Sequence, residues 1–148
     1  PYAVAMSESV KFTCLFNWTD YQGESVTVVV RTLQGYRAER TERTPHWLRI
    51  TEPVFNVTYS DHFNITIWNT ATSLSNVTVT QVSVAAEGEP TYTVAMTAPS
   101  LPQPLPKNST IQQLKCYWNW NASKGKRVTI TASTSEGFTA SYSTVLPA

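Results

Sequence analysis

The sequence predicts an all-β fold made of antiparallel β-sandwich modules in two related repeats, and three observations predict it. Ser and Thr make up 36 of the 148 residues, and the apolar residues are rich in Val, Tyr, Trp and Phe, a composition typical of strands. Several segments alternate between apolar and polar residues with a period of two, as half-buried strands do. One stretch of the chain also occurs twice.

The repeat places Cys14–Trp18 and Cys116–Trp120 in register at a spacing of 102 residues, without a gap. The register continues at further pairs: Gly23 with Gly125, Thr32 with Thr134, Gly35 with Gly137, and Tyr36 with Phe138. Each copy reads as strand, Gly turn, strand, Gly turn. We place the boundary at Ala86–Pro90, which gives a first module of residues 1–88 and a second of residues 89–148. The second module is shorter, so it is either truncated or completed by the first.

The alternation predicts strands in order along the chain, each with its apolar members facing a core. They are Pro1–Met6, Val10–Trp18, Glu24–Thr32, Pro53–Tyr59, His62–Trp68, Ser75–Val84, Thr91–Thr97, Thr110–Trp120, Lys126–Thr134 and Phe138–Leu146. The inward sets include Val26, Val28 and Val30, and Phe55, Val57 and Tyr59. A change of phase near Gln81 predicts a β-bulge. Four prolines between Pro99 and Pro106 predict either an extended polyproline-like connector or a crossing at a sheet edge.

The asparagines indicate the compartment, because six of the eight lie in Asn-x-Ser/Thr sequons. Chance would give about two among eight, by the acceptor rule. The six are Asn17, Asn56, Asn64, Asn76, Asn108 and Asn121. On three predicted strands the sequon lies on the polar face, where a glycan can extend into water. We therefore expect a secretory-pathway glycoprotein with N-glycans at these six positions.

Cys14 and Cys116 occupy matching positions of the repeat, and a secreted protein favours their oxidation. A disulfide between them is the first expectation, with partners outside this sequence or free buried thiols as the alternatives. An immunoglobulin framework has its two Cys on different strands of one domain and a Trp on a third strand. Here a Trp follows each Cys by four residues on the same strand. This disfavours the ordinary immunoglobulin framework but leaves an immunoglobulin-like sandwich open.

Two surfaces are candidates for partner contact. Tyr36–Thr44 carries Arg37, Arg40 and Arg43 and could bind heparan sulfate, although its Glu residues favour a solvated loop that neutralises its own charge. Trp68 lies on the outward register of its strand and is a candidate contact residue. Trp18 and Trp120 share the inward face with the cysteines and are expected in the core.

Composition and motifs exclude several functions. Charged residues make up 14% of the chain and the net charge is +1, which gives no basis for nucleic-acid binding. Two His residues give no metal site, and no Gly-x-Ser-x-Gly elbow or phosphate-binding Gly loop is present. We therefore expect no catalytic residues, no cofactor and no enzyme activity. No apolar run is long enough to span a bilayer, so a membrane-anchored protein would be represented here by its ectodomain.

Three stretches resemble the major outer-envelope attachment glycoprotein of gammaherpesviruses, the lymphocryptovirus type. They are Thr91–Met96, Trp118–Trp120 and Phe63–Ile67 followed by a Thr-rich strand. The resemblance implies a glycan-coated β-sandwich on a virion surface, in a protein that binds a host-cell receptor, which for the lymphocryptovirus member is complement receptor type 2. No receptor-binding residue is carried over, because the similar segments match other modules of that family.

The expected function is accordingly that of an extracellular viral envelope glycoprotein ectodomain, used for host-cell attachment or as a glycan-shielded spacer. One alternative is a host cell-surface adhesion or receptor domain of immunoglobulin or fibronectin type. The other is a secreted carbohydrate-binding module that uses Trp68 or Trp47.

Overall fold

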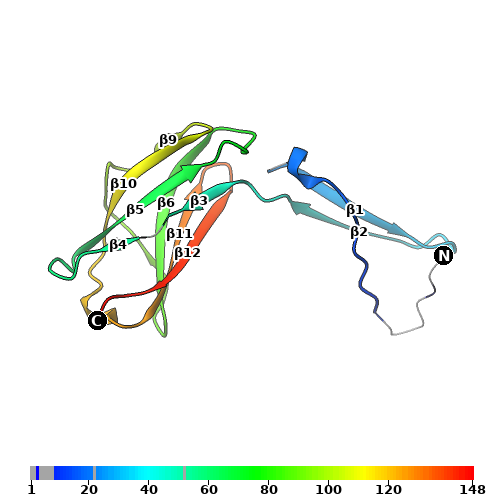
Figure 1. Cartoon of the computed structure of the whole chain (residues 1–148). Coiled ribbons are helices and arrows are strands. Elements are labelled where there is room, and N and C mark those ends of the chain that lie inside the picture. The colour runs from blue at the N-terminus through cyan, green and yellow to red at the C-terminus, as the bar shows by residue number, and fades with distance from the viewer. Residues whose placement is uncertain (1–2, 4–8, 22, 52) are drawn as a thin grey trace.

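The computed structural model describes residues 3, 9–21, 23–51 and 53–148. In this part of the chain the regular structure consists of twelve β-strands and two short 3-10 helices. Figure 1 shows a β-sandwich and a two-stranded hairpin that projects from it. The predicted all-β, immunoglobulin-like antiparallel sandwich is confirmed. The strand expected at Pro1–Met6 falls almost entirely outside the described residues.

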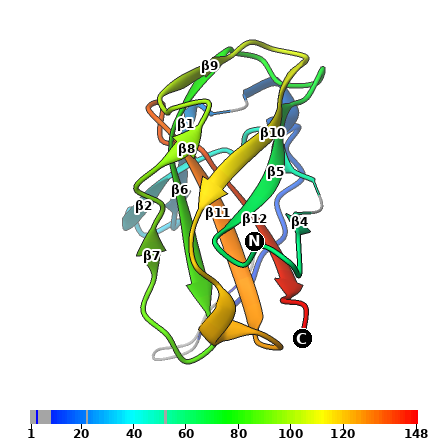
Figure 2. The ribbon, with the colours of Figure 1, turned by 90° about the vertical axis from the view of Figure 1, so that its left-hand side faces the viewer.

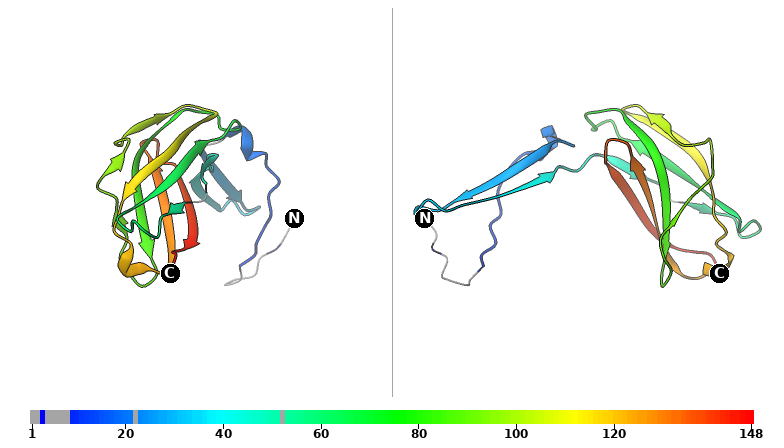
Figure 3. Two further views of the ribbon diagram at one scale, coloured as in Figure 1. Left: turned by 60° about the vertical axis from the view of Figure 1, so that its left-hand side comes forward. Right: turned by 180° about the vertical axis from the view of Figure 1, so that it is seen from behind.

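The N-terminal hairpin consists of β1 (Ser25–Arg31) and β2 (Arg37–Arg43), preceded by the 3-10 helix η1 (Trp18–Tyr21). The two strands pair antiparallel from Ser25 opposite Arg43 to Arg31 opposite Arg37. Figure 3 shows from behind how the hairpin extends away from the sandwich.

The sandwich has two antiparallel sheets, and in Figure 2 the view is onto the sandwich with the hairpin behind it. The first sheet has the order β3 (Leu48–Ile50), β5 (His62–Asn69), β10 (Ser109–Tyr117), β8 (Thr97–Ala98), and β4 (Val54–Phe55) also pairs with β5. The second has the order β12 (Thr139–Val145), β11 (Arg127–Thr134), β6 (Val77–Ala86), β7 (Tyr92–Thr93), and β9 (Gln103–Leu105) also pairs with β6. The 3-10 helix η2 (Asn121–Ser123) connects β10 to β11.

The core lies between the sheets and is formed by the inward half of each alternating strand. On β5 every second residue is buried, with Phe63 and Ile67 fully so, as the period of two requires. Trp120 is also fully buried and donates its indole N–H to the His62 carbonyl at 3.1 Å. This satisfies the polar atom of a large apolar side chain.

Two predicted irregularities are present. The register of β6 against β11 shifts beside Gln81, between the pairs Ser133–Gln81 and Thr134–Val79, which confirms the bulge. The proline-rich residues begin directly after β8 in one sheet and include β9 in the other, so this segment crosses from sheet to sheet at the edge of the sandwich.

The predicted division into modules 1–88 and 89–148 differs from the structure. Both sheets contain strands from both ranges, because β10 pairs with β5 and β11 pairs with β6. The predicted boundary is a turn between β6 and β7. Glu89 in this turn accepts hydrogen bonds from Ser123 Oγ at 2.9 Å and Lys126 Nζ at 2.6 Å, which connect it to the second half of the sequence.

Three strand predictions are corrected. Residues 9–17 form no strand, although Val10–Trp18 alternates, because no neighbouring strand pairs with this segment among the described residues. Pro53–Tyr59 contributes only the two residues of β4. Val57 and Tyr59, expected inward, are 61% and 60% exposed because the chain turns away from β5 after Phe55. Tyr36–Thr44, expected as a loop, supplies β2.

Candidate interaction surface

The N-terminal hairpin is closed by local hydrogen bonds that its own sequence supplies. Gly35 adopts φ +90°, a left-handed conformation that Gly accepts without a Cβ penalty. The Thr32 amide donates to the Tyr36 carbonyl at 2.9 Å, and the Tyr36 amide donates to the Thr32 hydroxyl at 3.1 Å. The turn therefore fixes the pairing of β1 with β2 without help from the sandwich.

The hairpin exposes apolar side chains that were expected in a core. Val28 is 53%, Val29 40% and Val30 55% exposed, and every residue of β2 is exposed. The prediction that these valines face a core is thus wrong for Val28 and Val30, while Val26 is half-buried, because no second layer of the described residues covers this face. Exposed contiguous apolar surface on a soluble protein indicates a contact site.

The same hairpin has an unpaired edge. Within the described residues β1 pairs only with β2, as members of a two-stranded sheet. Two backbone hydrogen bonds give the direction of the strand: the Thr32 amide donates to the Tyr36 carbonyl, and the Thr44 amide donates to the Glu24 carbonyl at 3.0 Å. The backbone N–H and C=O groups of the even-numbered residues of β1 therefore point toward β2. Successive residues of a paired strand alternate in direction, so odd-numbered residues present their N–H and C=O groups at the free edge. An edge of this kind is a template for a further strand.

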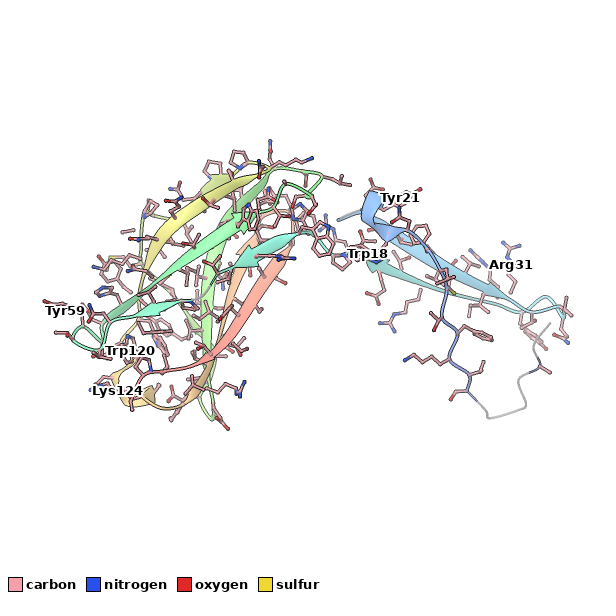
Figure 4. All side chains as sticks on the ribbon, in the orientation of Figure 1. Trp18, Tyr21, Arg31, Tyr59, Trp120 and Lys124 are labelled. Atoms are coloured by element: carbon pink, nitrogen blue, oxygen red, sulfur yellow. The ribbon has the colours of Figure 1, made fainter. Side chains whose placement is uncertain are left out.

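The base of the hairpin contacts the sandwich at Phe138, at the turn between β11 and β12. The Arg43 guanidinium lies 4.6 Å from the centroid of the Phe138 ring, and its Nη1 donates to the Glu136 carbonyl. Arg43 Nε donates to the Gly23 carbonyl at 2.7 Å. Gly23 lies so close to Phe138 that a Cβ on it would overlap the ring. In Figure 4, Trp18 and Tyr21 lie at this base and Arg31 lies toward the far end of the hairpin.

Aromatic contacts complete the base. Trp18, expected in a core, is half-buried here, with its ring centroid 5.4 Å from that of Trp47. His46 is buried and stacks on Phe138 at 4.4 Å. Burial lowers the pKa of His46, against smaller raising effects from its hydrogen bond with Ser75 and from the charge of Glu136. The neutral imidazole is therefore favoured in this contact.

The arginines proposed as a heparan-sulfate patch are neutralised locally. Arg37 forms an ion pair with Glu39, and Arg40 pairs with Glu42 at 2.5 Å, while Arg43 is engaged with the sandwich. Trp68, the other predicted contact residue, is half-buried on β5 in the sandwich. The structure therefore does not unite the predicted contact residues in one surface. The valines of β1, which form the exposed surface, were assigned to a core instead.

The six sequon asparagines lie on accessible parts of the molecule. Five are exposed and Asn64 is half-buried; the exposed five are Asn17, Asn56, Asn76, Asn108 and Asn121. None points into the core, which leaves each of them accessible to a glycan. N-glycosylation itself stays a prediction at these positions.

The predicted disulfide between Cys14 and Cys116 is absent, and both thiols are free. Cys116 is fully buried on β10, whereas Cys14 is exposed in the segment before η1. The two cysteines are equivalent in the repeat but differ in their surroundings, because only the segment with Cys116 lies inside the sandwich. Burial raises the pKa of the Cys116 thiol to about 12.

No catalytic or metal centre emerges from the described residues. None of their His, Cys, Asp and Glu side chains form a group of three or more that could hold a metal ion. His62 Nδ1 and Asp61 Oδ1 are 2.6 Å apart, and the hydrogen bond lowers the pKa of Asp61. No described hydrogen bond connects this pair to a Ser or Cys side chain. In the same part of the chain, no helix has the length and apolar character needed to cross a bilayer.

Comparison with known proteins gives fold relatives only. No protein-family model matches the chain, and no curated protein matches it significantly. Among solved structures it resembles the archaeal flagellum of Methanospirillum hungatei strain JF1, with TM-score 0.54 and 10% identity over 68% of this chain. The match spans 65% of that flagellar chain.

Two further structures come from Sulfolobus acidocaldarius. The archaellum periplasmic stator protein FlaG matches with TM-score 0.51 and 19% identity, over 67% of this chain and 99% of FlaG. The stator complex of FlaF and FlaG matches with TM-score 0.51 and 19% identity, over 70% of this chain and 92% of the other. At these identities the likeness shows a shared sandwich fold.

These findings overturn the viral interpretation. The fold relatives are archaeal flagellum and periplasmic stator proteins, so the resemblance to a gammaherpesvirus attachment glycoprotein is wrong. The host-cell receptor and heparan sulfate as partners, and the adhesion and carbohydrate-binding alternatives, likewise lack support. Of the predicted location, the relatives support the extracellular-facing part and contradict the virion surface.

Proposed function

We propose that this chain is a non-catalytic structural module of an archaeal cell-surface assembly, which works by making β-sheet contacts with neighbouring protein. One observation carries the proposal: the N-terminal hairpin holds Val28 and Val30 more than half exposed, beside an edge of β1 that no described strand pairs with. Proteins normally cover or charge such edges unless the edge takes a partner.

The remainder of the molecule suits a rigid scaffold. The sandwich has a closed core around Trp120 and no described cluster of metal-binding side chains. The relatives named as flagellum and periplasmic stator proteins share its fold, which supports a role in an assembly outside the cytoplasmic membrane. The exposed sequons are suited to N-glycans on that outer surface.

The location is tested by labelling intact cells with a membrane-impermeant maleimide. The variant Ala71→Cys places a thiol at an exposed turn of the sandwich, remote in sequence from the hairpin. We expect labelling of the double variant Cys14→Ser, Ala71→Cys on intact cells to equal labelling after lysis, with Cys14→Ser alone as the background, since Cys14 is itself exposed. Labelling only after lysis would contradict an outward-facing location.

The structural role is tested on the same labelled cells. After gentle shearing without detergent, the labelled chain should sediment in particles much larger than a monomer. Labelled chain that sediments only as a monomer would contradict the assembly role, whatever the result for location.

A further inference from the structure

The N-terminal hairpin has the same backbone pairing as the C-terminal hairpin, β11–β12, and its first strand and turn are also repeated in sequence. At the spacing of 102 residues, the pair Ser25–Arg43 becomes Arg127–Val145, and both pairs are in register. The cross-strand hydroxyl contacts are also equivalent, at 2.7 Å for Thr27 with Thr41 and 2.8 Å for Thr129 with Ser143.

The turns are equivalent too. Gly137 has φ +84°, close to the +90° of Gly35. The Thr134 amide donates to the Phe138 carbonyl at 3.0 Å and the Phe138 amide to the Thr134 hydroxyl at 3.1 Å, which matches Thr32 and Tyr36 bond for bond. The two hairpins therefore have the same local design.

Their surroundings differ. In the C-terminal copy β6 pairs along the outer edge of β11, and Val128, Ile130 and Ala132 are fully buried against the other sheet. In the N-terminal copy the matching residues are Val26, Val28 and Val30. Among the described residues, β1 has only β2 beside it, and no second sheet covers these valines. The N-terminal hairpin thus has the side chains of a core but lacks the strands that would enclose it.

The segment before the hairpin shows the same mismatch. Leu114, Cys116 and Trp120 are fully buried on and after β10. Their equivalents Phe12, Cys14 and Trp18 lie outside any core: Phe12 is 56% exposed, Cys14 exposed and Trp18 half-buried. Residues 9–44 as a whole therefore correspond to the last three strands of a sandwich like the one that residues 46–146 complete.

We propose that residues 9–44 are the C-terminal part of a second sandwich of the same design, and that a strand equivalent to β6 occupies the free edge of β1. That strand belongs to the same polypeptide, N-terminal to residue 1, and runs antiparallel to β1. Like β6, which reads Val-Thr-Val-Thr from Val77, it alternates between apolar and small polar residues. This deepens the proposed function, because the module becomes one of a series of sandwiches joined through the hairpin.

A second copy of this chain is a poorer source of the missing strand. Both edges of β6 are already used, by β11 on one side and by β7 and β9 on the other, so another copy cannot offer β6 without opening its own sandwich. The edge strand β12 of another copy could extend the sheet, but it would leave the face with Val28 and Val30 uncovered. Strands supplied in series along one polypeptide cover both the edge and the face.

The test compares amide hydrogen exchange of β1 in the 148-residue chain and in the polypeptide that includes its natural preceding sequence. The informative amides are the odd-numbered ones, Ser25, Thr27, Val29 and Arg31, which point to the free edge. We expect fast exchange in the 148-residue chain and exchange slowed by roughly 10³-fold or more in the extended monomer, the ratio expected for a stable small domain. Fast exchange in both would overturn the proposal.

Protection that appears only on concentration-dependent self-association would overturn it in favour of a second copy.

A matched pair of variants adds a readout on side chains. In the extended polypeptide Val28→Asp should restore fast exchange, because it puts a charge in the proposed core, whereas Val29→Asp on the opposite face should not. In the 148-residue chain neither should change the unfolding midpoint of the sandwich. The maleimide labelling and the sedimentation experiment that test the proposed function do not depend on this result. The tandem sandwich and the proposed function can therefore fail separately.

Discussion

Replacement of Gly23 by Ala should release the hairpin from the sandwich without unfolding either part. Gly23 has φ +74° and lies against the far end of the Phe138 ring, so a Cβ there overlaps the aromatic carbons. Phe138 is only 8% exposed and is held from its other side by His46. The ring cannot rotate away without opening the core, and we therefore expect the hairpin to move instead.

The magnitude follows from the contacts that the movement breaks. Loss of the Arg43–Phe138 contact removes about 0.5–1 kcal/mol, the value of an exposed cation–π pair. Loss of the bond from Arg43 to the Glu136 carbonyl removes about 1.5 kcal/mol more, the low end for a charged donor because the site is exposed. A total of about 2 kcal/mol changes the docked-to-undocked ratio by a factor of roughly 30.

Gly125→Ala is the matched control, since Gly125 is the repeat equivalent of Gly23. It has φ +73°, but nothing lies within 4 Å of a Cβ built on it. It should lower the free energy of unfolding of the sandwich by about 1–2 kcal/mol, the cost of a left-handed L-residue, and leave the hairpin docked. Gly23→Ala should instead undock the hairpin and leave the free energy of unfolding of the sandwich unchanged.

Residual dipolar couplings measure docking directly. Couplings from β1–β2 and from the sandwich should fit one alignment tensor in the unsubstituted chain and in Gly125→Ala, and need two tensors in Gly23→Ala. Urea denaturation reports the stability of the sandwich separately. A single tensor for Gly23→Ala would refute the view that the contact with Phe138 holds the hairpin.

Three further outcomes follow from buried groups. A maleimide should add once to the native chain, at Cys14, and twice in denaturant, because Cys116 is fully buried; two native adducts, counted by intact mass, would contradict this. Asn69→Ala removes the hydrogen bonds from the buried side-chain amide to the carbonyls of Ser75 (3.0 Å) and Leu105 (3.1 Å). It should lower the free energy of unfolding by about 2–3 kcal/mol in urea titrations. A loss under about 1 kcal/mol would refute the structural role of these two bonds. Burial lowers the pKa of His46 below its ordinary 6.5, so the unfolded state binds more protons just below that pH and stability should fall as the pH drops from 6.5. His46→Phe should reduce that slope, and identical slopes in the two proteins would contradict the assignment.

The strands that sequence reasoning predicted best are those whose neighbours lie within the chain. His62–Trp68 alternates strictly, and the structure buries every second residue of β5 between β3 and β10. Lys126–Thr134 became β11 with its inward side chains fully buried. In these segments periodicity gave both the element and its buried face.

The same periodicity misled where the neighbours are missing. Val10–Trp18 and Val26–Val30 have patterns as regular as that of β11, yet they lie outside a core. Alternation states which side chains prefer burial, but the burial itself depends on strands elsewhere. The pairing of β5 with β10 across the 39 intervening residues, 70–108, is likewise a long-range choice that local pattern does not encode.

The candidate surface could have been suspected from one signal in the sequence. Residues 37–43 read Arg-Ala-Glu-Arg-Thr-Glu-Arg, with charges on both faces of the strand that follows the valine-rich β1. A strand charged on both faces cannot lie in the middle of a sandwich. Such a strand therefore lies at the edge of its sheet. The opposite edge of the hairpin, that of the apolar strand β1, is then the side that takes a partner.

The paired hairpins also separate what a hairpin needs to form from what it needs to be stable. Equal turns and registers in two different surroundings show that the local sequence is enough for formation. A two-stranded hairpin alone is at best marginally stable in water, so a further strand and a covering sheet would raise the stability of the N-terminal copy. If that cover is the rest of a preceding sandwich, the segment before it becomes a strand like β10 and Cys14 takes the buried place of Cys116. The Cys14 thiol, open to a maleimide in the 148-residue chain, should then resist the reagent in the extended polypeptide until denaturant is added. Equal labelling of Cys14 in both would count against a tandem sandwich, independently of amide exchange in β1.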